Sequence, residues 1–213
     1  FSYLGIALPL GSLASLQLRE LANLAQFYGI GTLRLTPWQN LLISDLPDSQ
    51  LLELQQCLVK LGFHWDANRW DSSLVACAGS KGCIKAASYT QSYGLALVSN
   101  LRQRLSLDQP INIHFSGCAK SCAQHHKSDI ALVGQEMIDS YDVYVGSGES
   151  SFGRQILQAV GANQIPGLIE QLVKIYQEKR LPAQSFQEFI NHQNLTKLQQ
   201  WLNHVSPVSR DLT

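Results

Sequence analysis

Four cysteines stand in two close pairs along the chain, and thiols grouped in this way have the chemistry of a metal or cluster site. Cys77 and Cys83 are separated by five residues, and Cys118 and Cys122 by three. A [4Fe–4S] cluster presents four iron corners, and each iron takes one thiolate. Two close pairs that are brought together by folding satisfy this requirement, so the spacing favours an iron–sulfur cluster.

The residues around the two pairs suit such a cluster. Glycines let backbone N–H groups approach the sulfur atoms and hydrogen-bond to them, which tunes the reduction potential. The glycines beside the cysteines are Gly79, Gly82 and Gly117. Cationic side chains would offset the negative charge of four thiolates, and those nearby are Lys81, Lys85 and Lys120.

Other uses of the thiols remain open. Structural zinc sites favour cysteine pairs two to four residues apart, so the five-residue gap after Cys77 fits zinc poorly. Disulfides are typical of exported proteins, and an odd count of five cysteines without an export signal disfavours them. The fifth cysteine, Cys57, lies within a helical leucine pattern and is predicted to fill a core.

Composition limits the classes of protein to consider. The 213 residues are 45% hydrophobic and 15% charged, which is enough apolar material for a buried core. A net charge of 0 argues against bulk binding to nucleic acid or to an acidic membrane. No apolar run is long enough to span a membrane, and the first residues, FSYLGIALPLGSL, lack the basic region of a signal peptide. We therefore expect a cytoplasmic protein, and a chain that opens on Phe1 rather than Met is expected to be a fragment.

Periodicity indicates the elements of the first third of the chain. Apolar residues predict a strand over 3–8, a helix over 13–28, strands over 32–36 and 40–44, and a helix over 48–61. This β-α-β-β-α order predicts an α+β unit in which helices cover one face of an antiparallel sheet. A change of composition places a domain boundary near residue 70.

Beyond that boundary, the elements must carry the cysteine loops. We predict a helix over 86–106, strands over 111–115, 129–134 and 141–146, and helices over 153–161, 164–180 and 185–203. The predicted domains are a first domain over 1–70, a cluster-binding domain over 71–163 and a C-terminal helical extension over 164–213 packed on it.

With these motifs in place, the chain resembles the nitrite and sulfite reductase family. GIALPLGSL followed by GTLRLTPWQNLLI is similar to the family's ferredoxin-like half domain, and residues 73–146 are similar to its α+β cluster-binding domain. The resemblance implies that a [4Fe–4S] cluster is held by Cys77, Cys83, Cys118 and Cys122. In members with siroheme, the residue at the position of Cys122 also bridges the cluster to the siroheme iron.

The resemblance also implies partners. Members consist of two related halves, and this chain is similar to the second, C-terminal half, so an N-terminal half of the same protein is an expected partner. The expected electron donor is a ferredoxin or a nicotinamide-dependent reductase, and the expected ligand is a tetrapyrrole. Neither nucleic acid nor a membrane is expected as a partner.

Two details predict the branch of the family. The second pair reads Cys118-Ala119-Lys120-Ser121-Cys122 where reductases usually show Cys-Pro-Asn-x-Cys, and the strand loop reads Thr36-Pro37-Trp38. Both resemble precorrin-3B synthase, which implies an oxygen-dependent monooxygenase of cobalamin biosynthesis that hydroxylates precorrin-3A with the help of a mononuclear non-haem iron. The alternative is a siroheme-dependent ferredoxin nitrite or sulfite reductase, because CAQHH followed by DIALVG is close to assimilatory reductases. A non-enzymatic [4Fe–4S] electron-transfer module is a third hypothesis.

Polar residues near Trp38 are candidates for tetrapyrrole contact. Arg34 and Thr36 alternate with leucines, so a strand places both on one face. The resemblance implies that this face, together with Gln39, looks toward the tetrapyrrole, where Arg34 pairs with a carboxylate and Lys120 orients another. The alternative is a solvated strand face.

Histidines and a glycine-rich loop complete the candidates. His114, His125 and His126 lie near the second cysteine pair and are weighed as ligands of a second iron, against a structural role. The loop over 146–153 follows a strand and precedes a predicted helix, so it suits an anion, although a plain connection is favoured.

Overall fold

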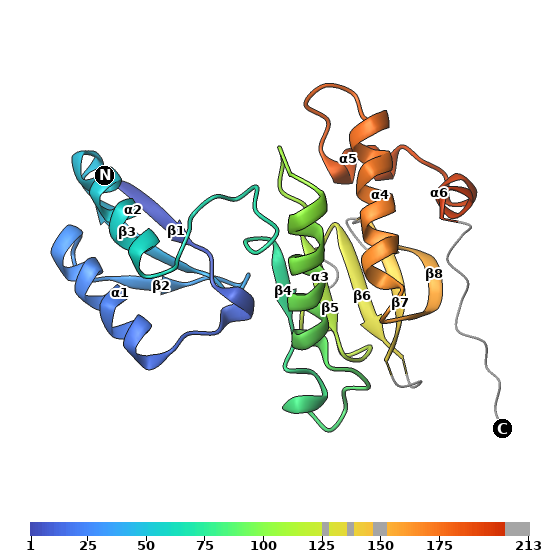
Figure 1. The fold of residues 1–213 in the computed structure, drawn as a ribbon, viewed down its shortest axis with the longest axis horizontal. Helices are drawn as coiled ribbons and strands as arrows, with labels where there is room; N and C mark the ends of the chain where they lie inside the picture. The colour runs from blue at the N-terminus through green and yellow to red at the C-terminus, as the bar shows by residue number, and fades with distance from the viewer. Residues whose placement is uncertain (125–127, 136–138, 147–152, 203–213) are drawn as a thin grey trace. The chain divides into compact units, whose positions relative to one another are not determined.

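The computed structural model places the chain in two compact units, Phe1–Leu74 (unit 1) and Val75–Thr213 (unit 2). The residues that it describes are 1–124, 128–135, 139–146 and 153–202. The two units confirm the predicted class, an α+β half domain followed by an α+β domain that carries the cysteines (Figure 1). No described helix is long and apolar enough to cross a membrane.

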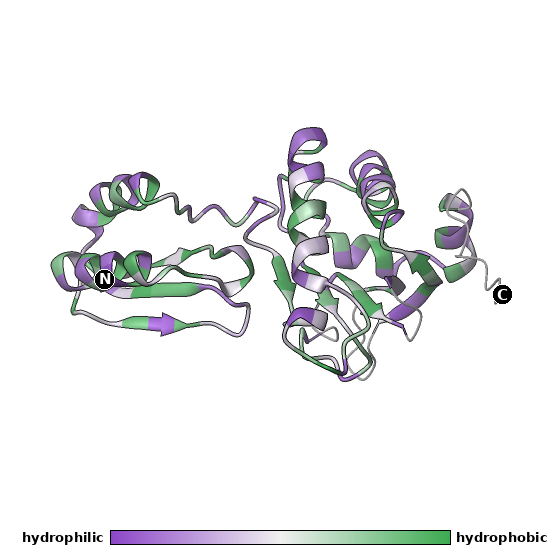
Figure 2. Cartoon of the chain, turned by 60° about the horizontal axis from the view of Figure 1, so that its bottom comes forward, coloured by the Kyte–Doolittle hydropathy of each residue, from purple (hydrophilic) through white to green (hydrophobic). Residues whose placement is uncertain are grey.

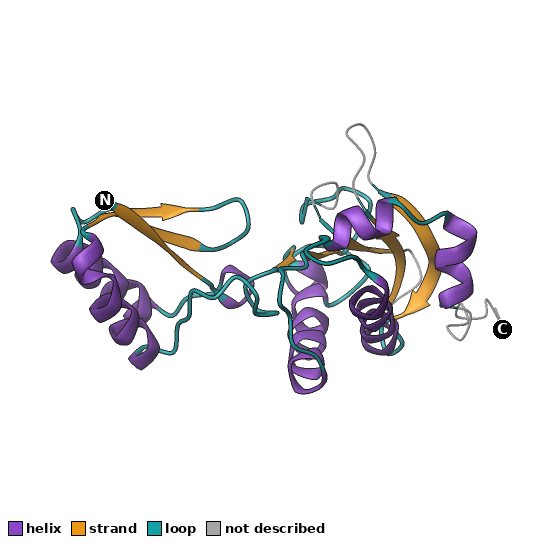
Figure 3. Cartoon of the chain, turned by 90° about the horizontal axis from the view of Figure 1, so that it is seen from above, coloured by secondary structure: helices purple, strands orange, loops and turns teal. Residues whose placement is uncertain are grey.

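Unit 1 is a three-stranded antiparallel sheet with helices on one face (Figure 3). Its strands are β1 (Ser2–Ile6), β2 (Leu33–Leu35) and β3 (Leu41–Leu46), in the order β1-β3-β2. Its helices are the 3₁₀ turn η1 (Pro9–Gly11), α1 (Ser15–Tyr28), the turn η2 (Asp48–Gln50) and α2 (Leu51–Lys60). The order of elements agrees with the prediction.

The core of unit 1 follows from the alternation of side chains along its strands and from the helical spacing of apolar residues along its helices. Ile43 on β3 pairs with Leu4 on β1 and with Leu33 on β2, so these side chains share the face toward the helices. The helices contribute residues four apart, Leu54 and Leu58 among them, which are fully buried. Cys57 packs against this core and lies 3.5 Å from the hydroxyl of Tyr28, which agrees with its prediction as a core residue.

Unit 2 is a five-stranded mixed sheet with helices packed on it. Its strands, in the order β4-β5-β6-β7-β8, are β4 (Leu74–Ala76), β5 (Ile113–Ser116), β6 (Ile130–Gly134), β7 (Ser140–Val145) and β8 (Arg154–Gly161). Its helices are η3 (Gly79–Lys81), α3 (Thr90–Arg104), α4 (Ile165–Lys179), α5 (Phe186–Asn191) and α6 (Leu195–Trp201). β5 and β6 are parallel, whereas β6–β7 and β7–β8 are antiparallel.

The central strands of unit 2 are buried on both faces. Every residue of β5 and of β6 is buried, and the strands of this sheet are mostly green in Figure 2. A parallel pair covered on both sides reads as a continuous apolar run, as IALVG does here. Helices α3 and α4 lie side by side over one face of the sheet (Figures 1 and 3).

The prediction of a helix over 153–161 is wrong, because this segment forms strand β8. Ile156, Leu157 and Val160 have helical spacing, but β8 pairs with β7 through register shifts and Ala159 has φ 51°. These irregularities put Ile156 and Val160 in the core without strict alternation. Asp142 on β7 accepts the N–H of Ala159 at 2.9 Å, which satisfies the irregular backbone.

The C-terminal helix predicted over 185–203 is two helices. Ser185 caps α5 by accepting the N–H of Glu188, whose carboxylate accepts the N–H of Ser185 in return. Asn194 caps α6 by accepting the N–H of Lys197 at 2.8 Å. The first helix ends at Asn191, and the cap at Asn194 begins a second helix within what periodicity reads as one. Likewise α3 begins at Thr90 rather than 86, because residues 86–89 belong to a cysteine loop.

We expect Asp142→Ala to destabilise unit 2. The Asp142 carboxylate is buried and accepts the side-chain N–H of Gln155 at 2.8 Å as well as the N–H of Ala159. Removing it leaves two donors unsatisfied, at a cost of about 1–3 kcal/mol in the free energy of unfolding. Asp142→Asn is the partial control, since its single amide oxygen can still accept one of the two hydrogen bonds and it should lose less stability than Asp142→Ala, and thermal unfolding of the two variants compares them. Equal midpoints for Asp142→Ala and the unaltered chain would contradict the assigned role.

Asp129 predicts a pH dependence of stability. Burial raises the pKa of its carboxyl, and hydrogen bonds from Asn112 lower it by less. Between the unfolded value of about 3.9 and the raised value, the folded state binds more protons, so the free energy of unfolding falls as pH rises through that window. Asp129→Asn lacks this titration. We expect the free energy of unfolding of Asp129→Asn, relative to that of the unaltered chain, to be higher at pH 7 than at pH 3.5, as measured by denaturation at both pH values. A relative free energy that is lower at pH 7 would show that the hydrogen bonds from Asn112 outweigh burial.

Candidate iron–sulfur site

The two cysteine loops lie side by side in unit 2, at the ends of neighbouring strands. Cys77 follows β4 directly, and Cys118 lies two residues beyond β5. The backbone N–H of Cys77 donates to the carbonyl of Phe115 at 3.0 Å, which extends the pairing of β4 with β5 into the loops. Folding therefore brings the two sequence-distant loops together, as their spacing predicts.

The peptide of Gly117 joins the loops on both of its sides. Its N–H donates to the sulfur of Cys77 at 3.1 Å, and its carbonyl accepts the N–H of Ala87 at 2.9 Å. A Cβ at position 117 would lie 2.6 Å from the Cβ of Ala86, a distance that real structures do not show. Glycine is therefore required for this contact. The Cys77 sulfur accepts a backbone N–H, as the sulfur ligands of iron–sulfur clusters do.

The loop of the second pair is tightly wound. The carbonyl of Cys118 accepts the N–H of Ser121 at 3.3 Å, and the carbonyl of Ser121 accepts the N–H of Gln124 at 2.8 Å. Ser121 and Gln124 both have positive φ, 60° and 51°. The hydroxyl of Ser116 accepts the N–H of Ala123 at 3.3 Å, so both ends of the loop are tied to the end of β5.

The loop of the first pair is held by the start of α3. Thr90, the first residue of that helix, is fully buried, and its hydroxyl donates to the carbonyl of Cys77 at 2.7 Å. Gly79 has φ 64°, and a Cβ there would lie 2.6 Å from the Thr90 hydroxyl oxygen. The sequence did not single out Thr90, and its only signal was its place at the beginning of a helix shortly after Cys83.

The exposure and charge of the loops suit a cofactor at the surface of the unit. Cys77, Cys83 and Cys118 are partly buried and Cys122 is exposed, and all five cysteines of the chain are free. The side chains of Lys81, Lys85 and Lys120 are exposed. In the described part of the chain, no three His, Cys, Asp or Glu side chains are grouped closely enough to hold a metal ion. The residues fit a cluster by their chemistry: two loops that hydrogen-bond to each other carry four thiols, and one of these thiols has a backbone donor.

The histidines do not form a second metal centre in the described part of the chain. His114 lies within β5 and is buried, with its Nδ1 3.2 Å from the carbonyl oxygen of Gln124. That contact links β5 to the loop of the second cysteine pair, which is a structural role. His125 and His126 lie outside the described residues, as do residues 147–152 of the glycine-rich loop.

Three of the four predicted tetrapyrrole contacts, Arg34, Thr36 and Gln39, belong to unit 1, and the fourth, Lys120, belongs to unit 2. Arg34 on β2 is exposed, and its Nε donates to the hydroxyl of Ser44 at 3.3 Å. Thr36 instead stabilises a turn, because its hydroxyl accepts the N–H of Asn40 at 3.1 Å. Gln39 has φ 60° and packs against Gly11, where a Cβ would lie 3.0 Å from that of Gln39. Trp38 between them is 42% exposed.

Asn40 is a residue of this loop that the sequence did not single out. Its side-chain oxygen accepts the N–H of Leu8 at 2.9 Å, and its side-chain nitrogen donates to the carbonyl of Ser72 at 3.3 Å. Its backbone carbonyl accepts the N–H of Thr36 at 2.9 Å. Asn40 thus ties the turn to two segments more than thirty residues away, and no local pattern announces such partners.

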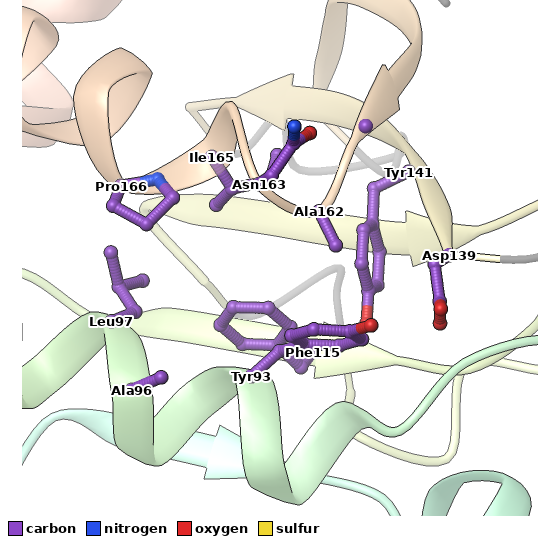
Figure 4. A pocket seen from close by; sticks show the side chains of 11 residues that line it. Tyr93, Ala96, Leu97, Phe115, Asp139, Tyr141, Ala162, Asn163, Ile165 and Pro166 are labelled. Carbon is purple, nitrogen blue, oxygen red and sulfur yellow. The ribbon is translucent and has the colours of Figure 1, made fainter.

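A pocket of ≈ 470 Å³ opens between α3, the sheet and the start of α4 (Figure 4). Tyr141 forms its inner wall, with its ring edge-to-face to Phe115 at 5.5 Å and to Tyr93 at 6.4 Å between centroids. Burial raises the pKa of Tyr141, and the neighbouring charges of Asp139 and Cys77 raise it further. Tyr141 is therefore a neutral aromatic wall near the Cys77 loop, and none of the four loop cysteines lines the pocket.

The three-stranded α+β fold of unit 1 and the two cysteine loops of unit 2 define an α+β protein with a candidate iron–sulfur site. Residues 1–61 match the nitrite/sulfite reductase ferredoxin-like half domain, and residues 71–208 match the nitrite and sulphite reductase 4Fe-4S domain. The chain belongs to the nitrite and sulfite reductase family. This confirms the family that the cysteine spacing suggested and the cluster type that it predicted.

Relatives from several organisms agree with this assignment. The chain is 32% identical over 200 residues to an assimilatory ferredoxin-dependent nitrite reductase of Haloferax mediterranei, covering 88% of this chain and 34% of that protein. It is 30% identical to sulfite reductase [ferredoxin] 2 of Mycolicibacterium paratuberculosis, covering 87% of this chain and 36% of that protein. The chain thus spans about a third of the length of these relatives.

Solved structures show the same fold. The NirA protein of Mycobacterium tuberculosis superposes with a TM-score of 0.79 at 27% identity, over 92% of this chain and 39% of that one. Dissimilatory sulfite reductase I superposes with a TM-score of 0.77 at 13% identity, over 99% of this chain and 71% of that one, which shows a shared fold alone.

The predicted precorrin-3B synthase activity is wrong, because the relatives are nitrite and sulfite reductases. That prediction rested on Ala119-Lys120 and on Pro37-Trp38. The side chains of Ala119 and Lys120 are exposed on their loop, and Trp38 is partly exposed on its turn. A change at such exposed residues alters neither the spacing of the cysteines nor the contacts of Gly117, so these residues do not identify the branch.

We expect Gly117→Ala to separate the two cysteine loops. The added methyl group meets Ala86, so the hydrogen bonds on both sides of the Gly117 peptide must lengthen, at about 1–3 kcal/mol. Gly167→Ala in α4 is the control, since its Cβ meets nothing within 4 Å and alanine favours a helix. Thermal unfolding and bound iron together make the measurement, and unchanged iron in Gly117→Ala would contradict the assigned role of this contact.

Proposed function

We propose that this chain forms the cluster-binding part of a siroheme-dependent, ferredoxin-linked nitrite or sulfite reductase, which is an oxidoreductase. One observation carries the proposal, namely that the Gly117 peptide joins the two cysteine loops and donates to a cysteine sulfur. The names of the relatives, which are ferredoxin-dependent nitrite and sulfite reductases, support the reaction and the electron donor.

The four loop cysteines are the proposed cluster ligands. Cys77, Cys83 and Cys118 are partly buried, which suits ligands that a protein shell protects from water, and Cys122 is exposed. The family resemblance implies that Cys122 would also contact the siroheme, and its exposure is compatible with that role. When bound, the cluster supplies single electrons, and siroheme supplies the iron at which the anion is reduced.

Residues of this chain would bind and orient the carboxylate-rich tetrapyrrole. The guanidinium of Arg34 suits bidentate pairing with a carboxylate, and the ammonium of Lys120 supplies a second cation. Both side chains are exposed. Gln39, which Gly11 and the Asn40 turn position, is proposed as a neutral hydrogen-bonding contact to the tetrapyrrole, and Thr36 as the residue that shapes this turn.

The working enzyme is proposed to contain more than the residues of this chain. The chain spans about a third of the length of its relatives, so an N-terminal half that completes the anion-binding surface is a proposed partner. A cytoplasmic location is proposed, because five free cysteines suit a reducing compartment.

Spectroscopy and metal analysis of the purified protein test the proposal. In the chain prepared alone, iron and acid-labile sulfide should be present near four of each, as a [4Fe–4S] cluster requires, and bound siroheme would add one further iron. Siroheme absorption bands should appear when the protein is prepared with its N-terminal half. A cluster without siroheme under those conditions would favour an electron-transfer module, and absence of iron and sulfide would overturn the proposal.

Single Cys→Ser variants should separate ligands from core cysteines. We expect Cys83→Ser and Cys118→Ser to lose most of the bound iron and sulfide, because cluster ligation is coupled to folding of the loops. Cys57→Ser is the matched control, since Cys57 packs against the core of unit 1. Iron and sulfide per chain are measured after anaerobic preparation, and loss of iron in Cys57→Ser alone would reverse the assignment.

A further inference from the structure

Cys77 is fixed more completely than the other loop cysteines. All three of its polar atoms have hydrogen-bond partners: its N–H donates to Phe115, its carbonyl accepts from Thr90, and its sulfur accepts from Gly117. These partners come from three separate places, namely a strand, the first turn of a helix and the opposite cysteine loop.

Within the described residues, the other loop cysteines make their hydrogen bonds inside their own loops. The carbonyl of Cys83 accepts the N–H of Ala86 at 3.1 Å, and that of Cys118 accepts the N–H of Ser121 at 3.3 Å. Both are turn contacts three residues apart. Cys122 is exposed. Within the described residues, Cys77 is therefore the loop cysteine whose own polar atoms are held from outside its loop, whereas the hydrogen bonds of Cys83 and Cys118 are local turn contacts.

Thr90 is the side chain that produces this difference. It is 0% exposed, its hydroxyl donates to the Cys77 carbonyl at 2.7 Å, and the same oxygen lies 3.8 Å from the Cys77 sulfur. A Cβ at position 79 would lie 2.6 Å from the Thr90 hydroxyl oxygen and 2.8 Å from its backbone N, so the loop packs closely against Thr90 only because residue 79 is glycine. The hydroxyl thus joins α3 to the backbone of one thiol-bearing residue.

We propose that Cys77 is the anchoring corner of the cluster and that Thr90 is its positioning residue. The proposal rests on the proposed function, because it needs a cluster for Cys77 to hold. A thiolate that is already oriented loses less conformational freedom when iron binds, so release of the cluster from this corner is slowed. The Thr90 hydroxyl contributes by holding the Cys77 carbonyl, while the Gly117 N–H stabilises the sulfur.

Thr90→Val tests the proposal, because valine keeps the shape of threonine and lacks the hydroxyl. The readout is the rate of cluster loss to an iron chelator, followed by the decay of cluster absorbance in the loaded protein. We expect loss about tenfold faster in Thr90→Val, in line with removal of partners that hold metal ligands. Thr90→Ser restores the hydroxyl and should stay within about twofold of the unaltered chain, since the hydrogen bond is kept.

Control variants keep the outcome unambiguous. Thr196→Val makes the same change at an exposed position of α6 and should leave the rate unchanged. If Thr90→Val does not fold, Thr90→Ser and Thr90→Ala form the second comparison, because both lack the methyl group and they differ only in the hydroxyl. The electron paramagnetic resonance spectrum of the reduced cluster should shift in the variants without the hydroxyl and not in Thr196→Val.

The results separate this inference from the proposed function. Absence of a cluster in the unaltered chain would overturn the proposed function. A normal cluster in the unaltered chain, with equal rates of loss and equal spectra in Thr90→Val, Thr90→Ser and Thr196→Val, would overturn the role of Thr90 alone.

Discussion

The contact of the Gly117 peptide with the opposite cysteine loop is the constraint on which the candidate site depends. Gly117 contributes two backbone groups: its N–H donates to the Cys77 sulfur, and its carbonyl accepts the N–H of Ala87. Because the contact needs two backbones to approach within the space of a missing Cβ, it demands glycine and a fixed register between the ends of β4 and β5. The order of strands in unit 2 therefore determines which thiols become neighbours.

The parts of the fold that local patterns could predict are those whose elements bury one regular stripe. The helices of unit 1 and the apolar strand β6 follow their periodicities closely. β8 does not, because Ile156, Leu157 and Val160 have helical spacing while the backbone is irregular at Ala159. That irregularity is stabilised by Asp142 on a different strand, and a tertiary partner of this kind leaves no trace in the local sequence.

The candidate site likewise has features that the local sequence could predict and features that it could not. Cysteine spacing and the neighbouring glycine are properties of the chain itself, so the cysteine loops and the family could be predicted. Thr90 and Asn40 were missed because their partners are backbone groups of residues distant in sequence, and any polar side chain of similar size looks alike before folding. The branch was mispredicted because its evidence came from exposed loop residues such as Lys120, which the fold does not constrain.

In both units, a polar side chain holds the backbone near a candidate site residue through hydrogen bonds. In unit 2, Thr90 ties the Cys77 backbone to a helix, and in unit 1, Asn40 ties the turn after Arg34 to Leu8 and Ser72. In each case a buried or partly buried polar side chain directs its hydrogen bonds to the backbone, so the chain next to a candidate site residue is held without using that residue's own functional group. The hydroxyl of Thr36 is used inside its turn, which leaves Arg34, oriented by one hydrogen bond to Ser44, as the cation of that face.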